Sequence, residues 1–176
     1  MEPNYPYFSM NIMGNKYSKD YLFIEKYLSN EIELWIEPFG GSFGLYKLFK
    51  HKIKDCVYND KDYDTYIKHG FYTNSYNEDY KFIVDKYNDD KSFFYFDPPY
   101  LDKEFYYDCK FSIDDHLELN KYIKKLKTKF ILSYNDKPLI RELYNDYTIE
   151  KVISKSMYRQ NEIIITNVWD KLHYLQ

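Results

Sequence analysis

Hydrophobic residues follow two patterns along this chain. Short runs in which most residues are apolar or aromatic predict buried β-strands, and stretches with apolar residues every three or four positions predict helices. Strands are expected at residues 32–36, 54–59, 71–76, 92–96, 130–133, 147–154 and 162–169. Helices are expected at residues 18–28, 45–49, 62–68, 77–87, 112–126 and 138–144.

The order of these elements predicts an α/β fold. Strands and helices alternate along most of the chain, and two consecutive strands follow at the end. Such an order indicates a mostly parallel sheet with helices on both faces and a C-terminal antiparallel hairpin. With 176 residues, the chain is expected to form a single domain over residues 1–176.

Composition limits the setting and the partners. No apolar run is long enough to cross a membrane, the chain starts without a signal-peptide pattern, and two cysteines are too few for a disulfide framework. We therefore expect an intracellular protein, in the cytoplasm or wherever a host or viral genome is handled. The formal net charge of -3 means that any nucleic-acid contact must come from a local patch. The four scattered histidines predict no metal site.

The strand at 92–96 ends in Asp97-Pro98-Pro99-Tyr100, here called the acid–proline corner. The prolines stop the strand because they lack an amide donor, and open α/β sheets bind ligands at the carboxyl ends of their strands. The corner offers a carboxylate, a backbone carbonyl at Pro98 and a flat ring at Tyr100. These groups suit a planar base with an exocyclic amine, although four such residues can also form a plain turn.

The strand at 32–36 runs into Glu37-Pro38-Phe39-Gly40-Gly41-Ser42-Phe43-Gly44, here called the glycine turn. A glycine-rich turn between a strand and a helix lets the backbone approach a nucleotide-like ligand closely. The turn lacks the full Gly-x-Gly-x-x-Gly spacing of dinucleotide sites. The acid at its start suits a ligand with a positive group, such as a sulfonium amino acid.

Three further segments are candidates for the same ligand. Asp60 ends the second strand, where an acid can accept hydrogen bonds from ribose hydroxyls or instead cap the following helix. Tyr76 could cover an adenine ring, with Asn74 or Ser75 as hydrogen-bonding partners. Lys16 follows a glycine before the first helix, as an anion contact or simply a surface lysine.

The lysines near the end of the helix at 112–126 also allow two interpretations. They can complement the negative end of the helix dipole, which we favour, or contact phosphates. They are Lys121, Lys124, Lys125, Lys127 and Lys129.

In its motifs and their order, the chain resembles the Dam-type (D12 class) N6-adenine-specific DNA methyltransferases. The matching segments are Gly14-Asn15-Lys16, Glu37-Pro38-Phe39-Gly40-Gly41, Asn59-Asp60, Phe71 to Tyr76, Asp97-Pro98-Pro99-Tyr100 and Ser133-Tyr134-Asn135-Asp136. The resemblance implies a Rossmann-like methyltransferase fold that uses S-adenosylmethionine. It implies methyl transfer to the amino nitrogen of adenine, without a metal.

The resemblance assigns roles to individual residues. The catalytic residues would be Asp97, Pro98, Pro99 and Tyr100, with Tyr100 stacking on the base. The cofactor-binding residues would be Met13, Lys16, Glu37, Pro38, Phe39, Gly40, Gly41, Ser42, Asp60, Lys61, Ser75, Tyr76 and Asp97. Tyr100, Lys155 and Arg159 would contact nucleic acid.

The chain departs from the family pattern in two ways. The family usually has a further glycine where this chain has Phe43, and Gly44 could replace it by a one-residue shift. The family also has a target-recognition domain where only residues 61–70 remain here, and its basic hairpin loop near the C-terminus is cut short. The chain is therefore interpreted as a minimal catalytic form with reduced sequence recognition.

Three functions remain open from the sequence. The favoured one is an adenine DNA methyltransferase that acts on short or single-stranded sites, or whose sequence recognition comes from a homodimer or a recognition subunit. The second is an RNA adenine methyltransferase, because unpaired bases need no flipping. The third is a catalytically silent, cofactor-binding subunit of a methyltransferase complex.

Overall fold

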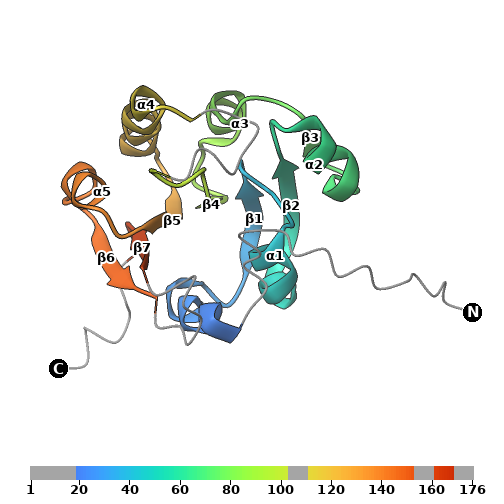
Figure 1. The fold of residues 1–176 in the computed structure, drawn as a ribbon. Coiled ribbons are helices and arrows are strands. Elements are labelled where there is room, and N and C mark those ends of the chain that lie inside the picture. Colours follow the sequence, from blue (N-terminus) through green and yellow to red (C-terminus); the bar gives the residue numbers. More distant parts are fainter. Residues whose placement is uncertain (1–18, 103–110, 153–160, 169–176) are drawn as a thin grey trace, which may run out of the picture.

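The computed structural model describes residues 19–102, 111–152 and 161–168, and they form a sheet flanked by helices (Figure 1). The sheet has seven strands in the order β3-β2-β1-β4-β5-β7-β6. The strands are β1 (Ile32–Glu37), β2 (Ile53–Asn59), β3 (Ser75–Tyr76), β4 (Ser92–Phe96), β5 (Lys129–Asn135), β6 (Thr148–Lys151) and β7 (Glu162–Thr166).

The pairing of the strands confirms the predicted α/β fold. The five strands from β3 to β5 in this order are parallel to their neighbours, whereas β7 runs antiparallel to both β5 and β6. The last hairpin therefore forms the antiparallel end of a mostly parallel, Rossmann-like sheet. Because β1, β2, β4 and β5 run in one direction, their carboxyl ends lie at one edge.

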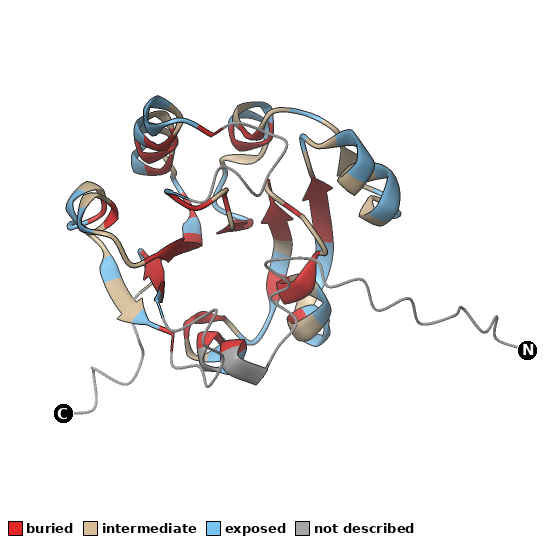
Figure 2. Cartoon of the chain, viewed as in Figure 1, coloured by how far each residue is buried: buried red, intermediate tan, exposed pale blue. Residues whose placement is uncertain are grey.

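Helices cover both faces of the sheet, as predicted (Figure 1). They are η1 (Lys19–Tyr27), α1 (Gly44–Phe49), η2 (Lys50–Lys52), α2 (Tyr63–His69), α3 (Tyr80–Tyr87), α4 (Ile113–Lys124) and α5 (Pro138–Leu143). Buried residues of α3, α4 and α5 form one core with one face of the sheet, and those of η1 and α1 form a second core with the other. Figure 2 shows the sheet buried between these two layers.

Local sequence signals begin most of the helices. Ser112 and Asp115 form the predicted capping box of α4, in which each side chain bonds the backbone of the other residue. The side chains of Asp62 and Asp79 cap α2 and α3, and Pro138 lies in the first turn of α5. None of the described helices is long and apolar enough to cross a membrane.

Two elements differ from the sequence prediction. The first helix is a 3₁₀-helix, and its buried residues Tyr21, Ile24 and Tyr27 follow at intervals of three, which is the period of that helix. The strand predicted at 71–76 is reduced to Ser75–Tyr76, and Phe71 is 83% exposed. The sequence analysis predicted a strand over all six residues, but the neighbouring β2 pairs with it only at its last two residues, Tyr58 and Asn59.

Candidate active site

The strands β2, β1 and β4 are neighbours in the sheet (Figure 1), and Asp60, the glycine turn and the acid–proline corner lie at their carboxyl ends. In the parallel register, Glu37 is opposite Tyr58, and Ile36 is opposite Phe94. The charge of Asp97, just beyond β4, contributes to the raised pKa of Glu37. The two acids therefore lie within electrostatic reach of each other at neighbouring strand ends.

Close packing explains Gly40 of the glycine turn, and a left-handed backbone conformation explains Gly41. A Cβ on Gly40 would lie 2.4 Å from the Tyr58 ring and 2.8 Å from the Asn59 carbonyl oxygen. Gly41 has a φ of 48°, and a Cβ there would meet nothing within 4 Å. The backbone amide of Gly41 donates to Asp60 Oδ2 at 2.9 Å. The turn thus packs against β2 on one side and leaves open space on the other.

Asn59 joins the glycine turn to the segment after β3. Its Nδ2 donates to the carbonyls of Pro38 at 2.8 Å and Glu78 at 3.0 Å, and its Oδ1 accepts from the Glu78 amide at 3.0 Å. The side chain is fully buried. The sequence analysis matched Asn59 only as the neighbour of Asp60. The sequence feature that could have identified Asn59 is a side-chain amide at the end of an apolar strand, because a buried amide there needs hydrogen-bond partners.

Asp60 bridges backbone groups rather than capping α2. Its Oδ2 accepts from Gly41 and its Oδ1 from the amide of Asp62 at 2.9 Å, while the cap of α2 is Asp62, which accepts from Thr65. The alternative that Asp60 caps this helix is therefore wrong. Burial raises the pKa of the Asp60 carboxyl. A carboxylate has about four acceptor sites, so ribose hydroxyls can still bind here.

Glu37 is a buried acid whose carboxyl accepts two hydrogen bonds. The residue is 2% exposed, and its Oε1 accepts from Trp35 Nε1 at 2.8 Å and from the Tyr46 amide at 3.0 Å. Burial is the main cause that raises the pKa of Glu37 to about 8, and the charge of Asp97 adds to it. A cation bound nearby would favour the carboxylate over the neutral acid.

Phe43 is the residue at which the sequence analysis expected a glycine from the resemblance. Its φ is 56° and its ψ is 44°, in the left-handed region that glycine adopts without strain. The fully buried ring lies 4.5 Å from that of Tyr46 and packs edge-on against Tyr58 and Tyr72. Gly44 is not among the positive-φ residues, so the proposed one-residue shift is wrong. Aromatic packing offsets the backbone strain and keeps the turn.

The predicted adenine segment lies beside Asp60, because the Asp60 amide donates to the Tyr76 carbonyl at 3.2 Å. Tyr76 is half-buried. Its hydroxyl forms a hydrogen bond with the Tyr87 hydroxyl at 2.7 Å and accepts one from the Lys86 ammonium at 2.9 Å. The Ser75 hydroxyl donates to the Tyr72 carbonyl. Tyr76 therefore lies next to Asp60, with the ammonium of Lys86 4.6 Å from the centre of its ring, whereas the Ser75 hydroxyl stabilises its own loop.

Lys61, Ser42 and Phe39 are further predicted cofactor residues, and the Phe39 ring stacks on that of Tyr80 at 5.2 Å. The Lys61 ammonium makes an exposed ion pair with Asp79 at 2.9 Å. Ser42 is half-buried, and its carbonyl accepts from Lys47 Nζ at 2.6 Å. Ser42 belongs to the glycine turn and Lys61 follows Asp60 in the chain. Neither side chain places a charge in the interior.

Tyr100 is the residue whose placement departs most from expectation. Its ring is 6% exposed and lies 6.0 Å from the ring of Tyr134, with 33° between the planes. Burial, and next the charges of Asp97 and Glu162, raise its pKa well above the ordinary tyrosine value. The predicted open stacking face is covered in this structure, so a base would have to displace the ring or bind at its edge.

β5 supports the corner through two neighbouring side chains. Asn135 Nδ2 donates to the Leu101 carbonyl at 2.8 Å, which holds the backbone just after Tyr100. Asn135 Oδ1 is buried and has no hydrogen-bond partner in the part of the chain that the structure describes. The Tyr134 hydroxyl bonds His116 Nδ1 of α4. The sequence analysis matched this strand end without giving either residue a role.

Glu162 is a further buried acid that the sequence analysis did not select. It starts β7 opposite Asn135, is 7% exposed, and accepts a hydrogen bond from the Tyr21 hydroxyl. Its charge is one of those that raise the pKa of Tyr100. An acid directly before an otherwise apolar strand was the available signal.

Four predicted residues lie outside the described part of the chain, namely Met13, Lys16, Lys155 and Arg159. Among the described residues, no group of three His, Cys, Asp or Glu side chains could hold a metal ion.

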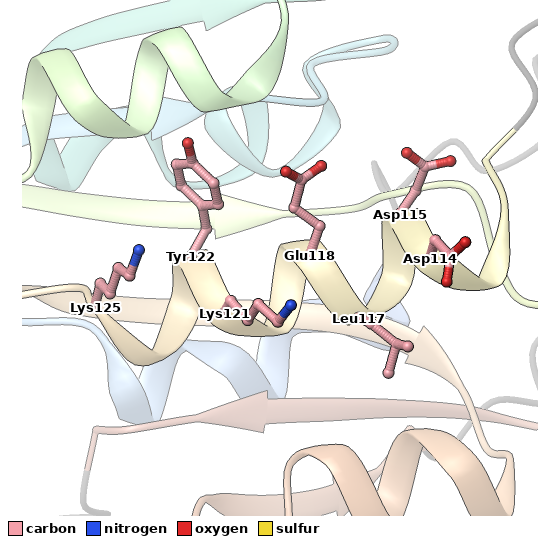
Figure 3. A pocket seen from close by; sticks show the side chains of 7 residues that line it. All are labelled: Asp114, Asp115, Leu117, Glu118, Lys121, Tyr122 and Lys125. Carbon is pink, nitrogen blue, oxygen red and sulfur yellow. The ribbon is translucent and has the colours of Figure 1, made fainter.

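Two surface features of α4 lie away from this site. A groove is lined by six residues of α4 between Asp114 and Tyr122 and by Lys125 at the C-cap, and Figure 3 shows their side chains along the helix. It contains none of the predicted site residues. The lysines that follow α4 lead into the start of β5, where Lys129 pairs with Phe93 at the opposite edge of the sheet. That position agrees with the favoured helix-dipole role.

Comparison with known proteins identifies relatives. The family model of the D12 class N6 adenine-specific DNA methyltransferases matches residues 61–159. The type II methyltransferase M.CviBI of Paramecium bursaria Chlorella virus NC1A is 31% identical over 121 residues, which are 62% of this chain and 40% of that protein. M.MjaIII of Methanocaldococcus jannaschii is 41% identical over 86 residues, or 43% of this chain and 29% of that protein.

The chain spans about two fifths or less of the length of these relatives. Among solved structures, a protein of Pyrococcus horikoshii proposed to be an RNA methyltransferase has 13% sequence identity and a TM-score of 0.47. It covers 78% of this chain and 74% of its own. An overlap of this quality carries no argument on substrate.

Proposed function

Because the chain belongs to the family of D12 class N6 adenine-specific DNA methyltransferases, we propose that it methylates the exocyclic amine of adenine in DNA. The observation that carries the proposal is the meeting of the glycine turn, Asp60 and the acid–proline corner at neighbouring strand ends. S-adenosylmethionine would supply the methyl group on its sulfonium. The chain itself supplies the binding surface and the acceptors for the amine.

The glycine turn and its neighbours fit this cofactor. The open space beside Gly41 admits a ligand against the backbone, and the buried Glu37 carboxyl suits the ammonium of the methionine part. Asp60 has acceptor sites left for the ribose hydroxyls, and Tyr76 lies beside it to flank the adenine. We include Met13, Lys16, Ser42 and Lys61 in this site on the resemblance of their motifs.

The acid–proline corner would hold the base that receives the methyl group. Asp97 and the Pro98 carbonyl accept hydrogen bonds from the two amine hydrogens, which directs the nitrogen lone pair out of the ring plane. Alignment of the nitrogen with the methyl group, and stabilisation of the positive charge that develops on it, then lower the barrier. The proton leaves the nitrogen after transfer, with Asp97 as the nearest base.

Recognition of the target would need surfaces beyond this site. Only residues 61–70 separate Asp60 from the predicted adenine segment, where the resemblance implies a target-recognition domain, so we propose that the chain acts on short or single-stranded DNA, or that a second subunit contributes recognition. Lys155 and Arg159 belong to the link between β6 and β7. Their assignment as contacts with the DNA phosphates rests on the resemblance and on their positive charge.

The test is transfer of a radiolabelled methyl group from S-adenosylmethionine to separate pools of double-stranded DNA, single-stranded DNA and RNA. Label in N6-methyladenine of DNA supports the proposal. Label in RNA alone supports the second function considered above, and cofactor binding without any transfer supports the third. Each of the last two outcomes overturns the proposed activity.

The variant Asp97→Asn tests the role of the corner. We expect transfer to fall by about 10²–10³-fold, because the amide no longer offers a charged acceptor to the amine. Cofactor affinity, measured by calorimetry, should change much less than transfer, since Asp97 is only one of the residues predicted to bind the cofactor. Asp114→Asn, on the exposed surface of α4, is the matched control. Unchanged transfer by Asp97→Asn would exclude Asp97 as an acceptor.

A further inference from the structure

The ammonium of Lys86 joins helix α3 to the end of strand β3. Lys86 lies in the last turn of α3 and donates a hydrogen bond to the Tyr76 hydroxyl at 2.9 Å. Its nitrogen lies 4.6 Å from the centre of the Tyr76 ring, 5.4 Å from that of Tyr87 and 5.6 Å from that of Phe82. At these distances a cation is attracted to an aromatic ring. Three rings and one hydroxyl therefore hold this ammonium in place.

The Tyr76 hydroxyl has a second partner. It forms a hydrogen bond with the Tyr87 hydroxyl at 2.7 Å, and the planes of the two rings meet at 67°. The hydrogen bond from Lys86 is the first cause of the lowered pKa of Tyr76. A network of hydrogen-bonded side chains restricts the motion of its members. The orientation of the Tyr76 ring is therefore fixed at its hydroxyl end.

The backbone of Tyr76 is fixed independently of its side chain. Tyr76 pairs with Asn59 in the parallel register of β3 and β2, and its carbonyl accepts from the Asp60 amide at 3.2 Å. The Nδ2 of the next residue, Asn77, donates to the Asp60 carbonyl at 2.8 Å. Loss of the Lys86 ammonium would therefore release the Tyr76 ring but leave its Cα beside Asp60.

The strand order places this ring where the adenine of the proposed cofactor would lie. The strands β1, β2 and β3 are neighbours (Figure 1), and Glu37, Asp60 and Tyr76 lie at their carboxyl ends in that order. A cofactor with its ammonium at Glu37 and its ribose at Asp60 points its base toward the next strand end. Tyr76 offers that base a flat ring whose hydroxyl is already held.

We propose that Lys86 is a positioning residue, which orients the Tyr76 ring for contact with the adenine of the cofactor. The inference rests on the proposed use of S-adenosylmethionine and adds a residue that lies outside all the matched motifs. Lys86 also complements the negative end of the α3 dipole, which is a purely structural role. The two roles differ because only the positioning role acts through the Tyr76 hydroxyl.

The first test is binding of S-adenosylhomocysteine, measured by calorimetry, because this ligand has the adenosine part but no methyl group to transfer. Lys86→Met should raise the dissociation constant about five- to tenfold. Lys86→Arg should restore it to within about twofold of the unchanged chain, since a guanidinium can donate to the same hydroxyl. Lys127→Met removes a lysine that is likewise exposed, between α4 and β5, and as the matched control should leave the affinity unchanged.

A double-variant cycle separates the positioning role from the structural one. Tyr76→Phe keeps the ring but removes the hydroxyl, and should weaken binding by about the same factor as Lys86→Met. Because both variants remove the same contact, the double variant should bind no more weakly than Tyr76→Phe alone. In turnover with S-adenosylmethionine, KM should rise in all three variants while kcat changes by less than about twofold.

A fluorinated tyrosine at position 76 reports the contact without any ligand. Its ionisation, followed by fluorine NMR, should move to higher pH in Lys86→Met, because the ammonium no longer stabilises the phenolate. Circular dichroism of each variant confirms that α3 still folds.

Several results would overturn the proposal. Lys86→Met that binds S-adenosylhomocysteine as tightly as the unchanged chain excludes the role. Losses that add in the double variant, or that Lys127→Met shares, assign Lys86 a general effect on the fold. An unchanged ionisation at position 76 excludes the contact itself. An unchanged chain that binds no S-adenosylhomocysteine overturns this inference and the proposed function together, whereas binding without methyl transfer overturns the proposed function alone.

Discussion

The glycine turn and the acid–proline corner lie at neighbouring strand ends, but different forces hold them. The turn is fixed by hydrogen bonds, in which Asn59 and Asp60 bind its backbone and Glu37 binds that of α1. At the corner, Tyr100 packs against Tyr134, and Asn135 donates a hydrogen bond to the Leu101 carbonyl. The turn leaves open space beside Gly41, whereas the Tyr100 ring at the corner is buried.

This difference matters because hydrogen-bonded and packed regions respond differently to substitution. A buried hydrogen-bonded region loses much of its stability when one group is left without its partner. A packed region loses stability in proportion to the volume removed and leaves the backbone path largely intact. Changes in the turn should therefore affect folding and cofactor binding together, and changes in the corner should affect transfer more than binding.

Glu37 gives the largest expected effect, through pH. A carboxyl with a pKa near 8 in the folded chain and 4.5 in the unfolded chain keeps a proton in the fold that the unfolded chain releases. The stabilisation is complete below pH 4.5 and is lost as pH rises through 8, on the order of 4 kcal/mol. Thermal unfolding without cofactor should show this decrease, and Glu37→Gln should remove most of it.

Cofactor binding provides the control for the pH effect. An ammonium beside Glu37 favours the carboxylate, so binding near pH 7 should release a proton, and calorimetry in buffers of different ionisation enthalpy measures that release. Glu37→Gln should bind without releasing this proton. A stability that rises between pH 5 and 8 in the unchanged chain but not in Glu37→Gln would contradict the assignment.

Gly40 and Gly41 allow a comparison inside the turn. Gly40→Ala should cost about 3 kcal/mol of stability, because its Cβ would overlap the Tyr58 ring and the Asn59 carbonyl. Gly41→Ala should cost about 1 kcal/mol, because only its φ of 48° is unfavourable. Denaturant unfolding measures both. Equal losses would mean that the turn relaxes and that contact with β2 is unimportant.

Phe43 tests whether packing outweighs backbone strain. Phe43→Gly relieves a left-handed residue, worth about 1–2 kcal/mol, and removes a buried ring, worth about 3–5 kcal/mol. We therefore expect a net loss of about 2 kcal/mol in the free energy of unfolding. Phe71→Gly is the control, because it makes the same substitution at an exposed position. A Phe43→Gly variant more stable than the unchanged chain would show that strain dominates.

Asn135 should give the smallest effect on stability and act on the corner alone. Asn135→Ala leaves the Leu101 carbonyl without its donor but also removes a buried acceptor that has no partner among the described residues, a net cost of about 1 kcal/mol. Transfer should decrease while cofactor affinity stays unchanged, as measured by turnover and calorimetry. Asn145→Ala, at an exposed position, serves as the control. Weakened cofactor binding would mean that the two regions are not separate.

Local patterns in the sequence were sufficient to predict the α/β fold class, the first residues of several helices, and the turns that follow β1 and β4. Runs such as residues 92–96 are apolar because both faces of a parallel strand are covered. A run of apolar residues can be recognised directly in the sequence. The capping box of Ser112 and Asp115 is equally local. The predictions for Glu37, Asp60 and Asp97 as neighbours followed from the parallel order alone.

Tertiary structure decided which groups are covered and which are charged. Tyr100 and Phe71 are both aromatic residues beside predicted functional segments, yet one is buried against Tyr134 and the other is almost fully exposed. The partners of Asn59 and the raised pKa of Glu37 depend on residues that lie far apart in the chain. Burial, and with it the free energy of each polar group, is set by contacts between segments. Local sequence patterns do not contain those contacts.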